Sequence, residues 1–211
     1  MARVKAGIML IRHRGLEPQV HADAYVAPTA TLVGDVVVGA QARIMYGAVL
    51  DAEGSRVEVG EYTIISENSV LRASAAAGLQ PVVVGDHVLA GPHVTLLGCT
   101  VGRGVYLGTG ATVLQTARLG EGTVVAVGAL VHARAVTPES FFVPPYSVAV
   151  GDPPRLLAPG DPELPAAVRE VGFAEVAFGA TAEWTDRVHR AEHATRLRSA
   201  EYSAHTDDTI L

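Results

Sequence analysis

The 211-residue sequence has little cysteine, few aromatic residues and little charge, and each shortage excludes a class of protein. The single cysteine, Cys99, excludes an intramolecular disulfide framework and suits a reducing compartment. Aromatic residues make up 5% against 49% for all hydrophobic residues, so aliphatic side chains must build the core. Charged residues make up 18% and the net charge is −6, so the basic surface that nucleic acids or acidic membranes require is missing.

Long hydrophobic runs are missing as well. The apolar run at residues 6–11 is too short for a secretory segment or a bilayer span. We therefore expect a cytoplasmic protein that has no nucleic-acid or membrane partner. Its partners are expected to be a small solute or other proteins.

What the sequence does have is a repeat of six residues. Branched aliphatic residues recur at every sixth position from Val26 to Leu50 and, after irregular stretches such as 74–81, as far as Val131. The position four residues later holds a small or β-branched residue, such as Ala30, and the position directly after the aliphatic is often glycine. Neither the helical period of 3.6 nor the strand period of 2 gives this pattern. It predicts a parallel β-helix in which each hexad forms one face of a prism and three hexads form one coil.

The chain divides into three parts on this basis. We assign residues 1–157 to the β-helix with its N-terminal strand, 158–203 to a C-terminal helical segment that packs on the prism, and 204–211 to a flexible tail. The expected fold is therefore an all-β core followed by α-helices.

Two helices are expected in the C-terminal segment. The first begins with Asp161 as its N-cap and Pro162 at the first helical position, and ends near Gly172. The second spans about residues 181–203. Its apolar stripe is interpreted as a packing face against a neighbouring β-helix and consists of Trp184, Val188, Ala191 and Leu197.

Several stretches in one register resemble the γ-class carbonic anhydrases. They cover about two thirds of the chain and comprise residues 20–39 (VHADAYVAPTATLVGDVVVG), 44–50 (IMYGAVL), 97–102 (LGCTVG), 107–114 (LGTGATVL) and 151–155 (GDPPR). The resemblance implies the hexapeptide-repeat superfamily, a left-handed coil and a homotrimer. In that family, zinc is bound at each subunit interface by two histidines of one chain and one of its neighbour.

The three zinc positions hold other residues in this sequence. The resemblance places Arg72, Pro92 and Leu97 on them, and none of these side chains can ligate zinc. His93 cannot replace Pro92, because one step along an extended chain turns the side chain to the opposite face. The sequence therefore predicts no metal and no other cofactor. His87 and His132 are expected to be surface or interface residues.

Polar residues surround the first zinc position. Asp51 and Glu53 replace the arginine and the aspartate of the family's Arg-Gly-Asp triplet, and Glu67 lies just ahead of the position of Arg72. We expect Arg72 to pair with Asp51 or Glu67. In one interpretation this ion pair fills the pocket; in the other the pocket persists, Arg72 binds an anionic substrate, and Glu53, Glu67 or His93 transfers protons.

Three functional hypotheses follow. The first is a homotrimeric, metal-independent acid/base enzyme, of lyase or hydrolase type, acting on a small anionic metabolite at the subunit interface. The second is a non-catalytic scaffold or binding trimer, which Pro92 and Leu97 favour because they suggest a drier site. The third is an acyl-CoA transferase with His87 or His93 as its base, although the tryptophan, Trp184, lies far from the hexads.

Overall fold

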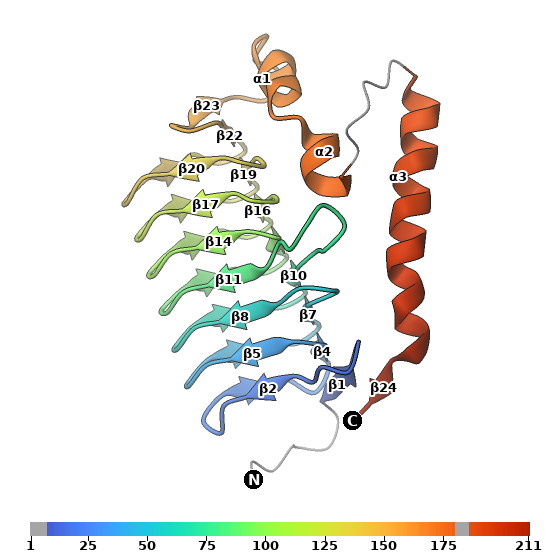
Figure 1. Ribbon diagram of the computed structural model, residues 1–211. Helices are drawn as coiled ribbons and strands as arrows, with labels where there is room; N and C mark the ends of the chain where they lie inside the picture. Colours follow the sequence, from blue (N-terminus) through green and yellow to red (C-terminus); the bar gives the residue numbers. More distant parts are fainter. Residues whose placement is uncertain (1–7, 180–185) are drawn as a thin grey trace.

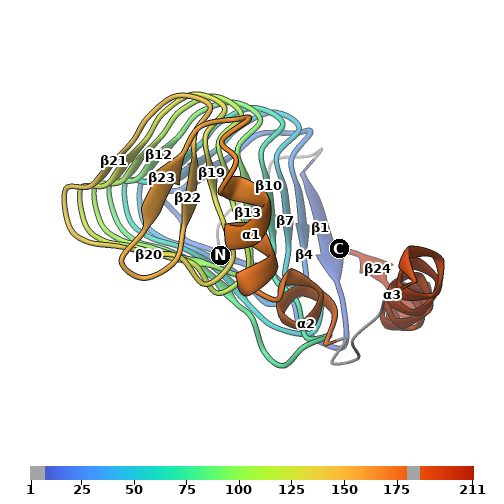
Figure 2. The ribbon, with the colours of Figure 1, turned by 90° about the horizontal axis from the view of Figure 1, so that it is seen from above.

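The chain coils into a left-handed triangular prism followed by helices (Figures 1 and 2). The computed structural model describes residues 8–179 and 186–211. Each coil passes through three sheets in turn, and successive coils pair in parallel. Many corner residues have positive φ, including Glu53, Asn68 and His93, and this allows the sharp bends between faces. The predicted parallel β-helix with C-terminal helices is confirmed.

Within the described residues, the strands form one ten-stranded sheet and two seven-stranded sheets. The first sheet contains β1 (Met9–Arg12), β4 (Thr31–Val33), β7 (Val49–Asp51), β10 (Val70–Arg72), β13 (Thr95–Leu97), β16 (Thr112–Val113), β19 (Leu130–Val131), β22 (Val148–Val150), β23 (Arg155–Leu157) and β24 (Thr209–Ile210). The second contains β2 (Gln19–Val20), β5 (Val36–Val38), β8 (Val57–Val59), β11 (Val82–Val84), β14 (Thr100–Val101), β17 (Arg118–Leu119) and β20 (Val136–Thr137). The third contains β3 (Tyr25–Val26), β6 (Arg43–Ile44), β9 (Ile64–Ile65), β12 (Leu89–Ala90), β15 (Tyr106–Leu107), β18 (Val124–Val125) and β21 (Phe142–Val143).

The hexad aliphatics form the core. In the first sheet, Leu32, Leu50, Leu71 and Leu96 are successive partners in adjacent strands, and all four are fully buried. Each such side chain contributes roughly 2 kcal/mol by leaving water. The small residues four positions later, such as Ala30, are buried as well, since a larger side chain would not fit the narrow interior.

Glycine after the aliphatic is explained by the stacking of corners. A Cβ added to Gly60 would lie 2.5 Å from the carbonyl carbon of Gly85 in the next coil, and one on Gly120 would lie 2.5 Å from the carbonyl carbon of Pro138. Because these contacts are with main-chain atoms, no side-chain movement can relieve them.

Gly60→Ala is therefore expected to lower the free energy of unfolding by about 2 kcal/mol, as overpacking does in a rigid core. Urea denaturation measures the effect. The adjacent exposed corner residue supplies the control, since Glu61→Ala should cost less than about 0.5 kcal/mol. Equal stability of the two variants would contradict the steric explanation.

The interruptions of the repeat fall at one corner, between the first and second sheets. The turn after β7 and the irregular stretch between β10 and β11 both lie there (Figure 1). Ser74 and Gln80 close the longer stretch through a pair of backbone hydrogen bonds. The other two corners keep their length, so departures from the hexad collect at one edge of the prism.

The C-terminal segment differs in part from the prediction. Its helices are α1 (Leu164–Glu170), α2 (Phe173–Phe178) and α3 (Arg187–Tyr202). The Asp161 carboxylate accepts from the Glu163 amide, but α1 begins two residues later than predicted, with Glu163 and not Asp161 as its N-cap. Gly172, at φ 65°, separates α1 from α2, a helix that the sequence pattern did not predict. None of the described helices has the length and apolarity needed to cross a membrane.

Helix α3 runs beside the prism, roughly along its axis (Figures 1 and 2). Its stripe residues Val188 and Leu197 are exposed, at 64% and 39%, and Trp184 lies outside the described residues. In a single chain Val188 and Leu197 are thus not buried against the prism.

Residues 204–211, which the sequence predicts as a flexible tail, contain a 3-10 turn and the short strand β24. Ser203–Asp207 form a 3-10 turn, and β24 pairs antiparallel with β1. Nothing in the local sequence reveals this partner, because β1 lies at the other end of the chain.

Candidate functional site

Of the residues predicted around the first zinc position, Asp51, Glu53 and Arg72 lie where β7 and β10 end. Leu50 and Leu71 point into the core, so the following residues, Asp51 and Arg72, point outward, and they are direct partners in the sheet. Arg72 Nε lies 3.7 Å from Asp51 Oδ2. Its Nη2 donates to Glu53 Oε1 at 3.3 Å, and the Glu53 side chain is 0% exposed. The predicted pairing of Arg72 with Asp51 is therefore present.

The C-terminal segment completes this cluster. The guanidinium carbon of Arg72 lies 4.5 Å from the centre of the Tyr202 ring, a cation–π contact. His205 bridges two carboxylates, with Nε2 2.9 Å from Glu53 Oε1 and Nδ1 2.8 Å from Asp208 Oδ2. The sequence alone did not reveal this closure of the site by residues after α3.

The chain of contacts ends at β1. His13 follows β1, and its Nδ1 lies 2.6 Å from Asp208 Oδ1. Arg14 Nε donates to His13 Nε2 at 3.2 Å. Because Nε2 accepts this bond, Nδ1 carries the proton and donates it to Asp208. The cluster thus joins the N-terminal strand, two central coils and the C-terminal segment.

The hydrogen bonds of the cluster shift two pKa values. Burial alone would lower the pKa of His205, but its bonds to Asp208 and Glu53 together raise it above the ordinary value. Burial acts to raise the pKa of Asp208, and the bonds from His205 and His13 outweigh it and lower the pKa. For Asp51, burial raises the pKa and the Glu53 amide offsets only part of this. The groups favour a protonated His205 between two carboxylates.

The two histidines of this cluster are poorly arranged to hold one metal ion together. His13, His205 and Asp208 bring three donor atoms together, as do Asp51, Glu53 and His205. However, the rings of His13 and His205 are stacked, 4.3 Å apart at 23°. A histidine lone pair lies in its ring plane, so two stacked, near-parallel rings cannot both direct their lone pairs at one ion. These side chains instead form a continuous chain of hydrogen bonds from Glu53 through His205 and Asp208 to His13.

Zinc does not fit the three positions that the resemblance assigns to it. Arg72 and Leu97 are direct partners on adjacent strands, as two ligands of one ion should be. Neither offers a lone-pair donor, and Arg72 is already engaged by carboxylates. Pro92 lies at the far corner of the same face.

Two predicted site residues lie apart from the cluster within the chain. Glu67 and His93 stack in the corner between the third and first sheets, where the His93 amide donates to the Glu67 carbonyl at 2.9 Å. This corner precedes β10, and Arg72 lies at the other end of that strand. The predicted alternative partner of Arg72, Glu67, is thus not its partner in this chain; Glu53 is.

The other histidines differ in their surroundings. His87 is exposed at a corner, where its ring stacks on Tyr62. His132, expected at the surface or an interface, is buried against the edge of Phe173 in α2, and burial lowers its pKa. The correction follows from α2, which covers the position and was not predicted.

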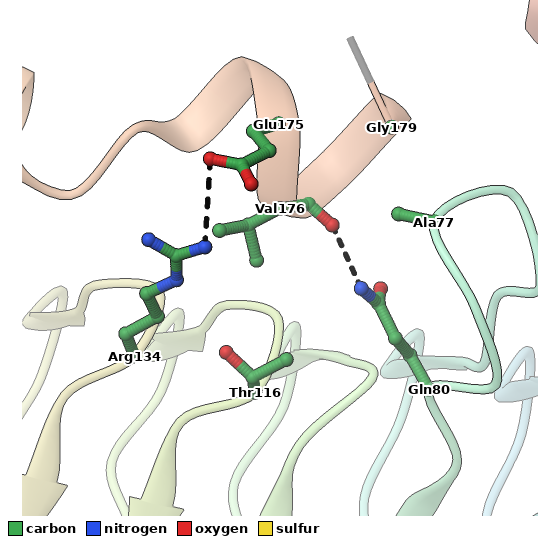
Figure 3. Close-up of a pocket in the computed structure, with 7 residues that line it drawn as sticks. All are labelled: Ala77, Gln80, Thr116, Arg134, Glu175, Val176 and Gly179. Atoms are coloured by element: carbon green, nitrogen blue, oxygen red, sulfur yellow. Dashed lines mark hydrogen bonds and ion pairs between the residues drawn. The ribbon is translucent and has the colours of Figure 1, made fainter. Parts of the chain in front are cut away.

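A separate cavity lies beneath α2 (Figure 3). Its volume is about 360 Å³, and its walls are Ala77, Gln80, Thr116, Arg134, Glu175, Val176 and Gly179. Gln80 donates to the Val176 carbonyl at 2.7 Å and Arg134 lies 3.7 Å from Glu175, so its polar walls are largely paired with one another. None of the predicted site residues lines it.

Comparison with known proteins identifies the family. The chain is 36% identical over 157 residues to γ carbonic anhydrase 1, mitochondrial, of Arabidopsis thaliana. The aligned region covers 70% of this chain and 55% of the plant protein. It is 30% identical over 143 residues to the carnitine operon protein CaiE of Salmonella agona, covering 68% of each chain. The chain thus spans about half the length of the curated plant relatives it matches. No family model matches.

The fold has a counterpart among solved structures. A hexapeptide transferase family protein from Anaplasma phagocytophilum superposes with a TM-score of 0.56 at 22% identity, over 95% of this chain and 98% of that one. This likeness is one of fold. The sequence relatives, with the register of the hexads, show that the chain belongs to the γ-carbonic-anhydrase-like proteins of the hexapeptide-repeat superfamily.

Proposed function

We propose that this chain forms a zinc-independent homotrimer that acts as a scaffold or binding protein and does not hydrate carbon dioxide. The observation that carries the proposal is the state of Arg72. Asp51, Glu53 and Tyr202 engage its guanidinium from within the chain. Two carboxylates beside one guanidinium leave no excess positive charge for a substrate anion. We call the group formed by Arg72 and its neighbours the Arg72 cluster; its members are Asp51, Glu53, Arg72, Tyr202, His205, Asp208 and His13. This cluster then serves to fasten the C-terminal segment to the prism.

The separation of the zinc positions supports the trimer. Pro92 lies in the corner before β13 and Leu97 ends that strand beside Arg72, so Pro92 and Arg72 lie at opposite ends of the face in the same subunit. A site built from all three positions needs the corner of a second chain. In such an assembly the neighbour's Glu67 and His93 would also face Arg72.

An apolar column on the third sheet also supports the trimer. Leu89, Tyr106 and Phe142 point outward on nearby strands and are 39%, 44% and 54% exposed. Ile64 and Val124 continue the column. It flanks the corner that carries Pro92, and burial against a neighbour would remove it from water.

Light scattering, metal analysis and a carbon dioxide hydration assay test the proposal. The expected results are three times the chain mass of 21.9 kDa, zinc far below stoichiometric, and hydration no faster than in buffer. Zinc near one equivalent per chain together with hydration activity would overturn the zinc-independent assignment. A monomer at micromolar concentration would overturn the trimer.

His205 favours a second candidate, an acid/base enzyme acting on a small anionic metabolite. This imidazole is partly exposed beside Arg72, and two carboxylates hold its proton. Calorimetric titration with malonate and with inorganic phosphate distinguishes the candidates. Heat that Arg72→Ala abolishes and Arg56→Ala preserves would show an anion site at Arg72, which the second candidate requires; no heat supports the scaffold. The acyl-CoA transferase hypothesis gains nothing from the surroundings of His87 or His93.

A further inference from the structure

The last residues of the chain are fastened over Arg72 by contacts of several kinds. We call residues 202–211 the C-terminal clasp. Ile210 pairs with Ile11, and the Leu211 amide donates to the Leu10 carbonyl at 2.9 Å. Tyr202 covers the guanidinium of Arg72. The clasp therefore covers one side of the Arg72 cluster.

His205 lies at the centre of these contacts. Glu53 faces it from the corner after β7, Asp208 from the clasp, the stacked His13 ring from β1 and the Tyr202 ring from α3. Behind these lie the charged groups of the cluster, namely Asp51, Arg72 and Arg14. When both ring nitrogens of His205 carry protons, each donates to a carboxylate; when one proton is lost, one of the two contacts loses its donor.

We propose that the C-terminal clasp is a pH-dependent lid over Arg72, closed while His205 carries both protons and opened as one leaves. The lid is a property of one chain and holds for either function proposed above. Opening would expose Arg72, Glu53 and Asp51 to solutes that the closed clasp excludes.

The direction of the pH dependence follows from the shifted groups. The pKa of His205 is raised above 6.5, so its stabilisation is complete below about pH 6.5 and is lost as the pH rises through the higher folded value. The pKa of Asp208 is lowered below 3.8, so its contribution is present above about pH 3.8 and is lost in acid. The raised pKa of Asp51 opposes folding once that carboxyl ionises. The lid is thus tightest in mildly acidic solution and loosens on the alkaline side.

Hydrogen exchange read by mass spectrometry tests the lid. Protection factors divide out the intrinsic pH dependence of exchange, so peptides covering residues 8–12 and 203–211 can be compared at pH 6 and pH 9. Protection should fall at pH 9 in the native protein. His205→Gln, which keeps one donor and cannot gain charge, should lower it about tenfold at pH 6 and remove the pH dependence. The exposed His189→Gln is the matched control and should behave like the native protein.

Two readouts keep the test decisive. The core peptide 100–107 should keep its protection in every variant, which separates lid opening from unfolding. At one fixed pH, p-hydroxyphenylglyoxal should label Arg72 faster in His205→Gln than in the native protein. Equal protection of the clasp at both pH values, with His205→Gln indistinguishable from native, would overturn the lid.

Discussion

Replacing Arg72, Pro92 and Leu97 together by histidine is expected to give a protein that binds about one zinc ion per chain, the stoichiometry of a three-histidine site with an open fourth position. Positions 72 and 97 are direct partners on adjacent strands, which places their side chains about 4.8 Å apart. The third histidine would come from a neighbouring chain. Metal analysis after exhaustive dialysis measures the uptake.

A variant with two histidines is the control. With Pro92 kept, Arg72→His and Leu97→His supply two ligands from one chain, and zinc should be lost on dialysis because two ligands hold it more weakly than three. Equal zinc in the double and triple variants would show that no neighbouring chain contributes. A folded triple variant that takes up no zinc would show that the three positions do not meet.

Arg72→Met is expected to lower the free energy of unfolding by about 3 kcal/mol, the low end of the cost of leaving a buried charge without its partner. Glu53 is fully buried, and its Oε2 has no hydrogen-bond partner in the described part of the chain. Losing the guanidinium leaves His205 as its remaining cation. Urea unfolding at one fixed protein concentration measures the change, since subunit association adds to apparent stability.

Two further variants, a control and a rescue, test this explanation. Arg56→Met removes an exposed arginine that pairs with Asp35 and Glu58, and should cost less than about 1 kcal/mol. Adding Glu53→Gln to Arg72→Met removes the buried charge and should recover part of the loss. If Arg72→Met is no more costly than Arg56→Met, the Arg72 cluster does not fasten the C-terminal segment.

The β-helix was predictable because its cause is periodic. Each aliphatic of the hexad meets the equivalent residue of the next coil, so one stacking rule fixes Leu32, Leu50 and Leu71 alike. The same rule explains the glycine at Gly60, where two main chains approach. Helix α2 escaped prediction because it is short and is stabilised by packing on the prism, including Phe173 against His132.

The candidate site was predictable only as far as the sheet register extends. Asp51 and Arg72 end equivalent strands, so their pairing follows from the repeat. Glu67 lies in the corner before β10, the strand that Arg72 ends, and the same register separates the two residues. His205 and Asp208 reach the site by a long-range strand pairing that no local pattern encodes, and the only hint was the presence of titratable residues after a helix.

The two reversed strands at the ends of the first sheet have a consequence for assembly. A solenoid grows by adding parallel strands, so an uncovered last coil offers its main-chain groups to another molecule. Here β24 covers one end of the ten-stranded sheet and β23 the other, and both run antiparallel to their neighbours. A second prism cannot continue this sheet in the parallel register that the repeat requires. Strand reversal at both ends thus prevents stacking into fibres along the first sheet and leaves the lateral faces for association.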